Sequence, residues 1–178
     1  MILEYKGKTP SIDATAYVSD DVVVTGDVEI GAYSSIWFKT VIRGDVAPVR
    51  IGDEVNIQDQ SMIHQSPNQP VIIEDGVTVG HQVLLHSSIV RKNALIGMGS
   101  IILDGAEIGE NAFIGAGSLV PPGKKIPPHT LALGRPAKVI RDLTEKDYEE
   151  MDRVRLSYLE KCQYYKEHTN LGIDLHEE

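Results

Sequence analysis

Aliphatic residues return at every sixth position over most of this chain, and that period limits the possible folds more than any other feature. A period of six rich in Ile, Val and Gly is typical of the hexapeptide repeats of a parallel β-helix, in which each repeat forms a short strand and a turn. A β-sandwich would alternate with period two, which does not explain the pattern. The sequence therefore predicts an all-β solenoid. The repeated positions are Ile12, Val18, Val24, Ile30, Ile36, Ile42, Ile51, Ile57, Ile63, Ile73, Val79, Leu85, Val90, Ile96, Ile102, Ile108, Ile114, Val120 and Ile126.

Composition limits the partners and the compartment. The 178 residues are enough for a sizeable core, and the net charge of -9 argues against nucleic acid or an anionic membrane surface as a partner. No apolar run is long enough to span a membrane. The single Cys162 excludes an intramolecular disulfide and fits a reducing compartment, so we expect a cytoplasmic protein.

The pattern changes near the C-terminus, where hexads give way to helical spacing. We predict a β-helix domain over residues 1–142 and a C-terminal region over residues 143–178, with a helix over about 145–168. Thr144 and Asp147 are spaced as a capping box. One face of the helix should pack on the solenoid or on a neighbouring subunit. That face consists of Tyr148, Met151, Arg155, Tyr158, Cys162 and Tyr165, widened by Val154 and Leu159.

Three histidines, His64, His81 and His86, lie within the repeats, which need aliphatic and small residues but no imidazoles. If three hexads form one coil, Arg43, His64 and His86 each follow a core aliphatic on one face in three consecutive coils. We name the faces first, second and third in chain order from Ile12, and this column lies on the third face. Neighbouring strands lie about 4.8 Å apart, which lets the His64 and His86 rings bind one metal ion.

His81 and Gln58 fall on the second face and do not obviously reach that pair within one chain. A trimer with its three-fold axis parallel to the solenoid would bring the second face of one subunit against the third face of the next. Each metal site would then be completed across an interface. Three histidines and an open fourth position are the pattern of a catalytic zinc site rather than a closed structural one.

Simpler interpretations remain open for each of these residues. An isolated histidine is more often an ordinary surface or core residue. Arg43 and Asp45 could form only an ion pair between subunits, and Asn56 and Gln58 could form an amide ladder.

The hexad phase breaks three times around the histidines. Three extra residues fall near Pro48–Arg50, four fall near Pro67–Pro70, and one residue is lost near Ile89. Insertions in a regular coil form loops or bulges, which often lie beside functional sites. The breaks therefore support a site at the histidine cluster.

Taken together, these motifs resemble the gamma-class carbonic anhydrases over nearly the whole chain. The motifs that carry the resemblance are Arg43-Gly44-Asp45, Asn56-Ile57-Gln58-Asp59, His64, Gly80-His81, His86 and Gly134-Arg135-Pro136-Ala137-Lys138. The resemblance implies a left-handed β-helix homotrimer that binds Zn²⁺, or Fe²⁺ or Co²⁺ in some members. His64 and His86 would come from one subunit and His81 from its neighbour.

The resemblance also implies roles for four further residues. Gln58 would hydrogen-bond a metal-bound hydroxide, with Asn56 orienting it, and Arg43 would pair with Asp45 across the interface and lie near bicarbonate. One departure concerns proton transfer, because Val46 and the loop QSPNQP after His64 supply no glutamate of the kind that shuttles protons in the archetypal enzyme.

The leading hypothesis is reversible hydration of CO₂ to bicarbonate by a metal-bound hydroxide. A second is a hexapeptide acyltransferase or CoA thioesterase, with one histidine as general base and no three-histidine metal site. A third is a non-catalytic scaffold that keeps the metal for assembly. Metal content separates the first two hypotheses.

Overall fold

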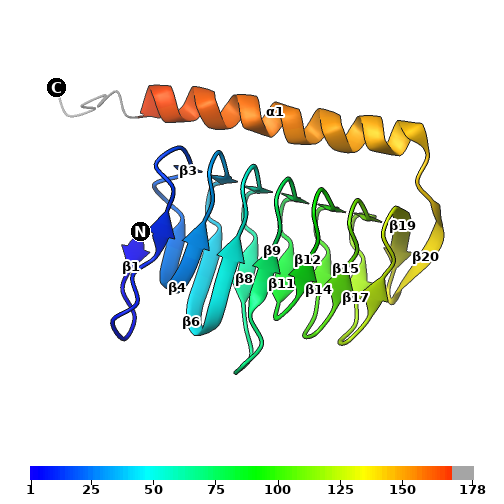
Figure 1. Cartoon of the computed structure of the whole chain (residues 1–178), viewed down its shortest axis with the longest axis horizontal. Coiled ribbons are helices and arrows are strands. Elements are labelled where there is room, and N and C mark those ends of the chain that lie inside the picture. The colour runs from blue at the N-terminus through cyan, green and yellow to red at the C-terminus, as the bar shows by residue number, and fades with distance from the viewer. Residues whose placement is uncertain (170–178) are drawn as a thin grey trace.

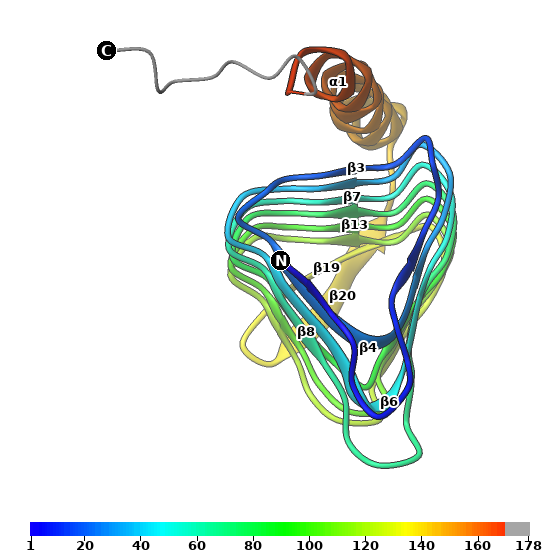
Figure 2. The same ribbon diagram turned by 90° about the vertical axis from the view of Figure 1, so that its left-hand side faces the viewer.

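The computed structural model describes residues 1–169 and consists of a parallel β-solenoid with one long helix along its side (Figure 1). Viewed along the solenoid, each coil is a triangle, and successive coils wind in a left-handed sense (Figure 2). The predicted left-handed parallel β-helix with a C-terminal helix is confirmed. Within residues 1–169, no helix has the length and apolarity that crossing a bilayer requires.

The second face is an eight-stranded sheet. The last two strands of this sheet pair antiparallel, which ends the parallel stack. The strands before them pair in parallel. Its strands are β3 (Tyr17–Val18), β5 (Ser35–Ile36), β7 (Asn56–Ile57), β10 (Thr78–Val79), β13 (Leu95–Ile96), β16 (Phe113–Ile114), β19 (Thr130–Gly134) and β20 (Ala137–Asp142).

The first and third faces form one twelve-stranded sheet, because β4 (Val23–Ile30) and β6 (Val41–Ile51) continue round the corner between them. On the third face follow β8 (Met62–His64), β11 (Leu84–His86), β14 (Ile101–Ile102) and β17 (Leu119–Val120). On the first face lie β2 (Ser11–Ile12), β9 (Val71–Ile73), β12 (Ile89–Val90), β15 (Glu107–Ile108) and β18 (Lys125–Ile126), while β1 (Ile2–Leu3) pairs with β4.

The hexad aliphatics form the core. Ile63 pairs with Ile42 and Leu85 in the neighbouring coils, and all three side chains are fully buried. Burying one such side chain stabilises a fold by about 1.5–3 kcal/mol. The same register fixes which residues point outward, so the core places the site residues.

The helix α1 (Glu145–Thr169) matches the helix predicted over about 145–168. Asp147 accepts hydrogen bonds from the backbone N–H of Thr144 at 2.7 Å and from its hydroxyl at 2.6 Å. The bond from the Thr144 N–H is the half of the predicted capping box in which the side chain three residues on accepts from the first backbone N–H. Residues 170–178 of the predicted C-terminal region lie outside the described part of the chain.

The helix packs on the second face of its own solenoid rather than leaving that face free (Figure 2). Its buried Cys162 joins a cluster with Tyr17 and Trp37 of the solenoid, against which Tyr158 and Tyr165 pack. Of the two packing partners considered for the helix, the solenoid of its own chain is therefore the one observed.

Candidate metal centre

The third face brings His64 and His86 together at the ends of β8 and β11. The two residues are direct register partners, as the face assignment predicts, and His64 Nδ1 lies 3.2 Å from His86 Nε2. Two nitrogen ligands of a tetrahedral Zn²⁺, each about 2.0–2.1 Å from the ion, lie about 3.3 Å apart. The spacing of the pair therefore fits two ligands of one ion.

Each ring of the pair is oriented by a carboxylate. Asp45 Oδ1 lies 3.1 Å from His64 Nε2, and Asp104 Oδ1 lies 2.5 Å from His86 Nδ1. Asp45 also pairs with Arg43 at 2.8 Å within the same chain, whereas the resemblance implies that this pair forms between subunits. Carboxylates in such positions fix the orientation and tautomer of ligand histidines.

The electrostatic environment favours the neutral form of His64. Burial, followed by the nearby Arg43 guanidinium, lowers the pKa of the His64 ring below its ordinary value. Neutral imidazole is the form that binds metals, so this shift favours the form of His64 that could act as a ligand. A hydrogen bond from Ser66 is the largest effect on the Asp104 carboxyl and lowers its pKa.

His81 lies apart from this pair, in the turn after β10 at the corner between the second and third faces. Its side chain is 41% exposed, and its Nδ1 lies 2.8 Å from Asp59 Oδ2. Within residues 1–169 of a single chain, no three His, Cys, Asp or Glu side chains come together to hold a metal. One chain therefore presents two histidines at one place and a third, outward-facing, at another.

The predicted contact of the second face with the third face of a neighbouring subunit stays a prediction. Within one chain, α1 packs over part of the second face. The corner that carries His81 remains exposed.

Gln58 and Asn56 form an ordered amide pair at the end of β7. Gln58 is only 4% exposed and donates from Nε2 to Asn56 Oδ1 at 3.0 Å, while Asn56 Nδ2 donates to Thr78 Oγ1 at 2.8 Å. These bonds fix the Gln58 amide, as the resemblance implies. In one chain Gln58 is on the second face, whereas the histidine pair is on the third.

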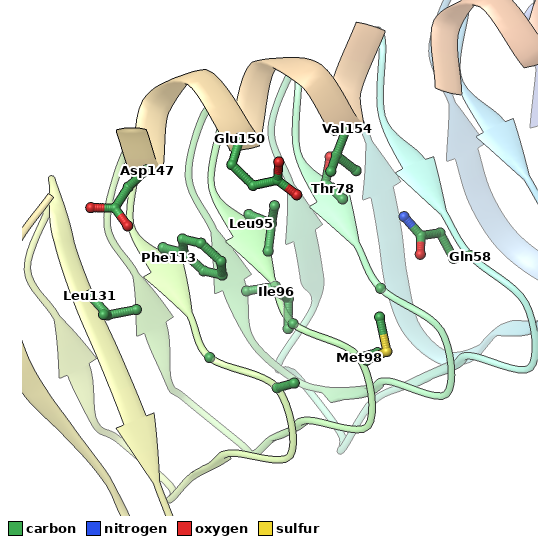
Figure 3. A pocket seen from close by; sticks show the side chains of 14 residues that line it. Gln58, Thr78, Leu95, Ile96, Met98, Phe113, Leu131, Asp147, Glu150 and Val154 are labelled. Atoms are coloured by element: carbon green, nitrogen blue, oxygen red, sulfur yellow. The ribbon is translucent and has the colours of Figure 1, made fainter. Parts of the chain in front are cut away.

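Gln58 also borders an apolar groove of about 350 Å³ between the second-face sheet and the first turns of α1 (Figure 3). Glycines form part of its floor, because a Cβ at Gly80 or Gly97 would lie 2.7 or 2.5 Å from the backbone of the next coil. The groove is lined mainly by Leu95, Ile96, Met98, Phe113, Leu131 and Val154.

Two of the carboxylates that orient histidines received no role from the sequence. Asp59 lies inside a motif that we quoted for the resemblance, but its contact with His81 was not foreseen. Asp104 follows His86 by 18 residues, which is one regular coil, and that spacing could have identified it.

This chain is similar in sequence to one family model and to several named proteins. Residues 87–122 match the family model described as bacterial transferase hexapeptide (six repeats). A protein of Geobacillus kaustophilus named carbonic anhydrase is 75% identical, over 93% of this chain and 91% of its own. Gamma carbonic anhydrase 1, mitochondrial, of Arabidopsis thaliana is 37% identical over 79% of this chain and 53% of its own. YtoA of Bacillus subtilis, 68% identical over 93% of this chain and 97% of its own, is named an uncharacterized transferase.

Proposed function

This chain belongs to the gamma carbonic anhydrase family, and from that premise we propose that it catalyses the reversible hydration of CO₂ to bicarbonate at a metal site shared between subunits of a homotrimer. The observation that carries the proposal is the His64–His86 pair, with two ring nitrogens 3.2 Å apart on an outward-facing sheet. His81 of a neighbouring copy supplies the third imidazole. The bound ion is Zn²⁺, with Fe²⁺ or Co²⁺ as the alternatives.

An apolar ladder on the third face supports the trimer. Its residues are half-buried in the single chain and pair directly from coil to coil along the solenoid, next to the column that carries His64 and His86. Continuous apolar surface of this kind marks a protein interface. The ladder consists of Val23, Val41, Met62, Leu84, Ile101 and Leu119.

A metal held by these histidines would supply hydroxide near neutral pH, since bound metal lowers the pKa of water. The chain supplies the surroundings. Gln58, held by Asn56, offers a fixed amide to the reacting oxygen. The Arg43 guanidinium, 40% exposed and held by Asp45, binds the bicarbonate anion.

Stopped-flow CO₂ hydration tests the proposal. The protein loaded with Zn²⁺, or with Fe²⁺ under anaerobic conditions, should accelerate hydration above the buffer rate, and its His64→Ala variant should not. Rates equal to buffer with both metals would defeat it. We place the activity in the cytoplasm, in keeping with a buried free Cys162.

Acyl transfer is the second candidate, favoured by the match to the transferase hexapeptide model and by the apolar groove beside Gln58. Metal analysis separates the two, since hydration requires about one ion per chain and acyl transfer with a histidine base requires none. A third possibility, a scaffold that keeps the metal for assembly, predicts that His81→Ala removes the metal and lowers stability without changing any rate.

A further inference from the structure

We propose that Asp104 is a positioning residue for His86, and that the loop inserted after His64 acts through Ser66 to hold Asp104 in place. The proposal rests on the function proposed above, because it treats His86 as a ligand. It assigns a purpose to the insertion near Pro67–Pro70, which the repeat itself does not need.

A continuous set of short contacts carries this inference. The Ser66 hydroxyl donates to Asp104 Oδ2 at 2.5 Å, and the other carboxylate oxygen, Oδ1, lies 2.5 Å from His86 Nδ1. Both oxygens of the carboxylate are therefore used, one by the loop and one by the imidazole. The bond from Ser66 limits rotation of the carboxylate, so its second oxygen stays directed at the ring.

The shortened corner between Ser66 and Asp104 helps to explain how Ser66 contacts a residue two coils away. Ser66 and Asp104 are 38 residues apart, which places them two coils from each other. The coil between them is shortened, since Leu85 and Val90 are five positions apart where Ile102 and Ile108 are six. At this corner Ser87 adopts φ = 44°.

Ser87 also links the two ends of the arrangement. Its hydroxyl accepts from the Ser66 N–H at 2.6 Å, and its carbonyl accepts from the Gly105 N–H at 2.7 Å. The shortened corner and the inserted loop are thus joined by the hydrogen bond between Ser87 and Ser66. Ser66, at the base of the loop, bridges the shortened coil and reaches Asp104 in the turn beyond it.

The chemical consequence is that His86 is held in one tautomer. A carboxylate facing Nδ1 keeps the proton on that nitrogen, which leaves Nε2 with its lone pair. In this structure His86 Nε2 is the atom that faces His64. Asp104 therefore presents the correct nitrogen of His86 to an ion shared with His64.

Nitrogen-15 NMR of the metal-free protein tests the tautomer directly. We expect His86 of the unaltered chain to carry its proton on Nδ1, Asp104→Ala to give a mixture of tautomers, and Asp104→Asn to restore the Nδ1–H form, because the amide oxygen still accepts. A pure Nδ1–H tautomer in Asp104→Ala would overturn the proposal. A carboxylate that only stabilised its turn would leave the tautomer unchanged.

Competition for Zn²⁺ against a chromophoric chelator supplies the second measurement. Loss of a supporting carboxylate typically weakens metal binding about 10- to 100-fold. We expect a loss in this range for Asp104→Ala, about tenfold for Asp104→Asn, and a severalfold loss for Ser66→Ala. Wild-type affinity in Asp104→Asn and Ser66→Ala would contradict the proposal even if Asp104→Ala failed to fold.

Asp53→Asn is the matched control. Asp53 also links two coils, by accepting from the Ala32 N–H at 2.8 Å, but it lies on the first-to-second corner away from the histidines. This variant should keep the metal affinity and the tautomer of the unaltered chain. If the unaltered chain bound no metal, the proposed function would fail, whereas the tautomer measurement would still decide whether Asp104 positions His86.

Discussion

The second and third faces are built from the same hexad repeat, but they differ in what covers them. Trp37 and Tyr17 on the second face are almost fully buried beneath α1 of the same chain. On the third face, the apolar ladder and the histidine pair have no covering element within residues 1–169. The repeat provides two flat surfaces, and one of them is completed by the chain's own helix. The other is suited to completion by a second copy.

The largest expected effect comes from removing the histidine that lies outside the pair. His81→Ala should reduce bound metal from about one ion per chain to none and bring CO₂ hydration to the buffer rate, because two imidazoles alone hold Zn²⁺ poorly. Elemental analysis and stopped-flow kinetics check this. His168→Ala, an exposed position on α1, should behave as the unaltered chain. Full metal content in His81→Ala would place the third ligand elsewhere.

The next effect concerns the uncovered face. Leu84→Lys puts an ammonium into the apolar ladder and should dissociate the trimer at micromolar concentrations, because each copy loses about 1.5–3 kcal/mol of burial and adds the cost of burying a charge. Light scattering after size exclusion measures the mass. Ile89→Lys, on the outward side of the first face in the next strand along the chain, should stay trimeric. A trimeric Leu84→Lys would show that the third face is not the interface.

A substitution on the second face, which α1 covers, should change the stability of the fold rather than the assembly of subunits. Trp37 is 3% exposed and contacts Tyr158 and Tyr165 of α1, so Trp37→Ala should cost about 3–5 kcal/mol of unfolding free energy. Urea unfolding measures this loss, and metal content per folded chain should be unchanged. Leu156→Ala, 55% exposed on the same helix, should change stability by less than about 0.5 kcal/mol.

A smaller effect tests how the covering helix begins. Arg141, followed by Thr144, holds the pKa of Asp147 far below its ordinary value. A depressed folded-state pKa stabilises the fold fully above the unfolded value of about 3.9, and this contribution is lost progressively as the pH falls from there through the folded-state pKa. Asp147→Asn should therefore cost about 1 kcal/mol at pH 7, and the cost should shrink steadily as the pH falls below about 4. Calorimetry over this pH range would contradict the interpretation if the difference stayed constant.

The sequence predicts the repetitive part of this molecule better than the exceptions to it. The period of six places Ile63 and Leu85 in the core and so sets His64 and His86 in register, because each coil copies the phase of the last. The helical spacing of Met151 and Cys162 likewise predicts a buried face, although not which surface it covers.

Contacts across irregular corners could not be foreseen in the same way. Ser66, at the base of an inserted loop, meets Asp104 beyond a shortened coil, and the period says nothing about the path of residues next to an insertion. Asp59 and His81 both stand two positions after a core residue in neighbouring coils, so the period places them side by side, but it does not give the direction of their side chains in the turns. In the sequence, the apolar ladder of the third face looks like any other set of aliphatic residues. Only the structure shows that no element of the described chain covers it.

The most direct test is a crystal structure of the metal-loaded protein with anomalous diffraction at the absorption edge of the metal. We expect one anomalous peak per chain at the contact between two subunits, bonded to His64 and His86 of one and to His81 of the next. A monomer, or a peak bonded to residues of a single subunit, would contradict a site divided between neighbouring copies.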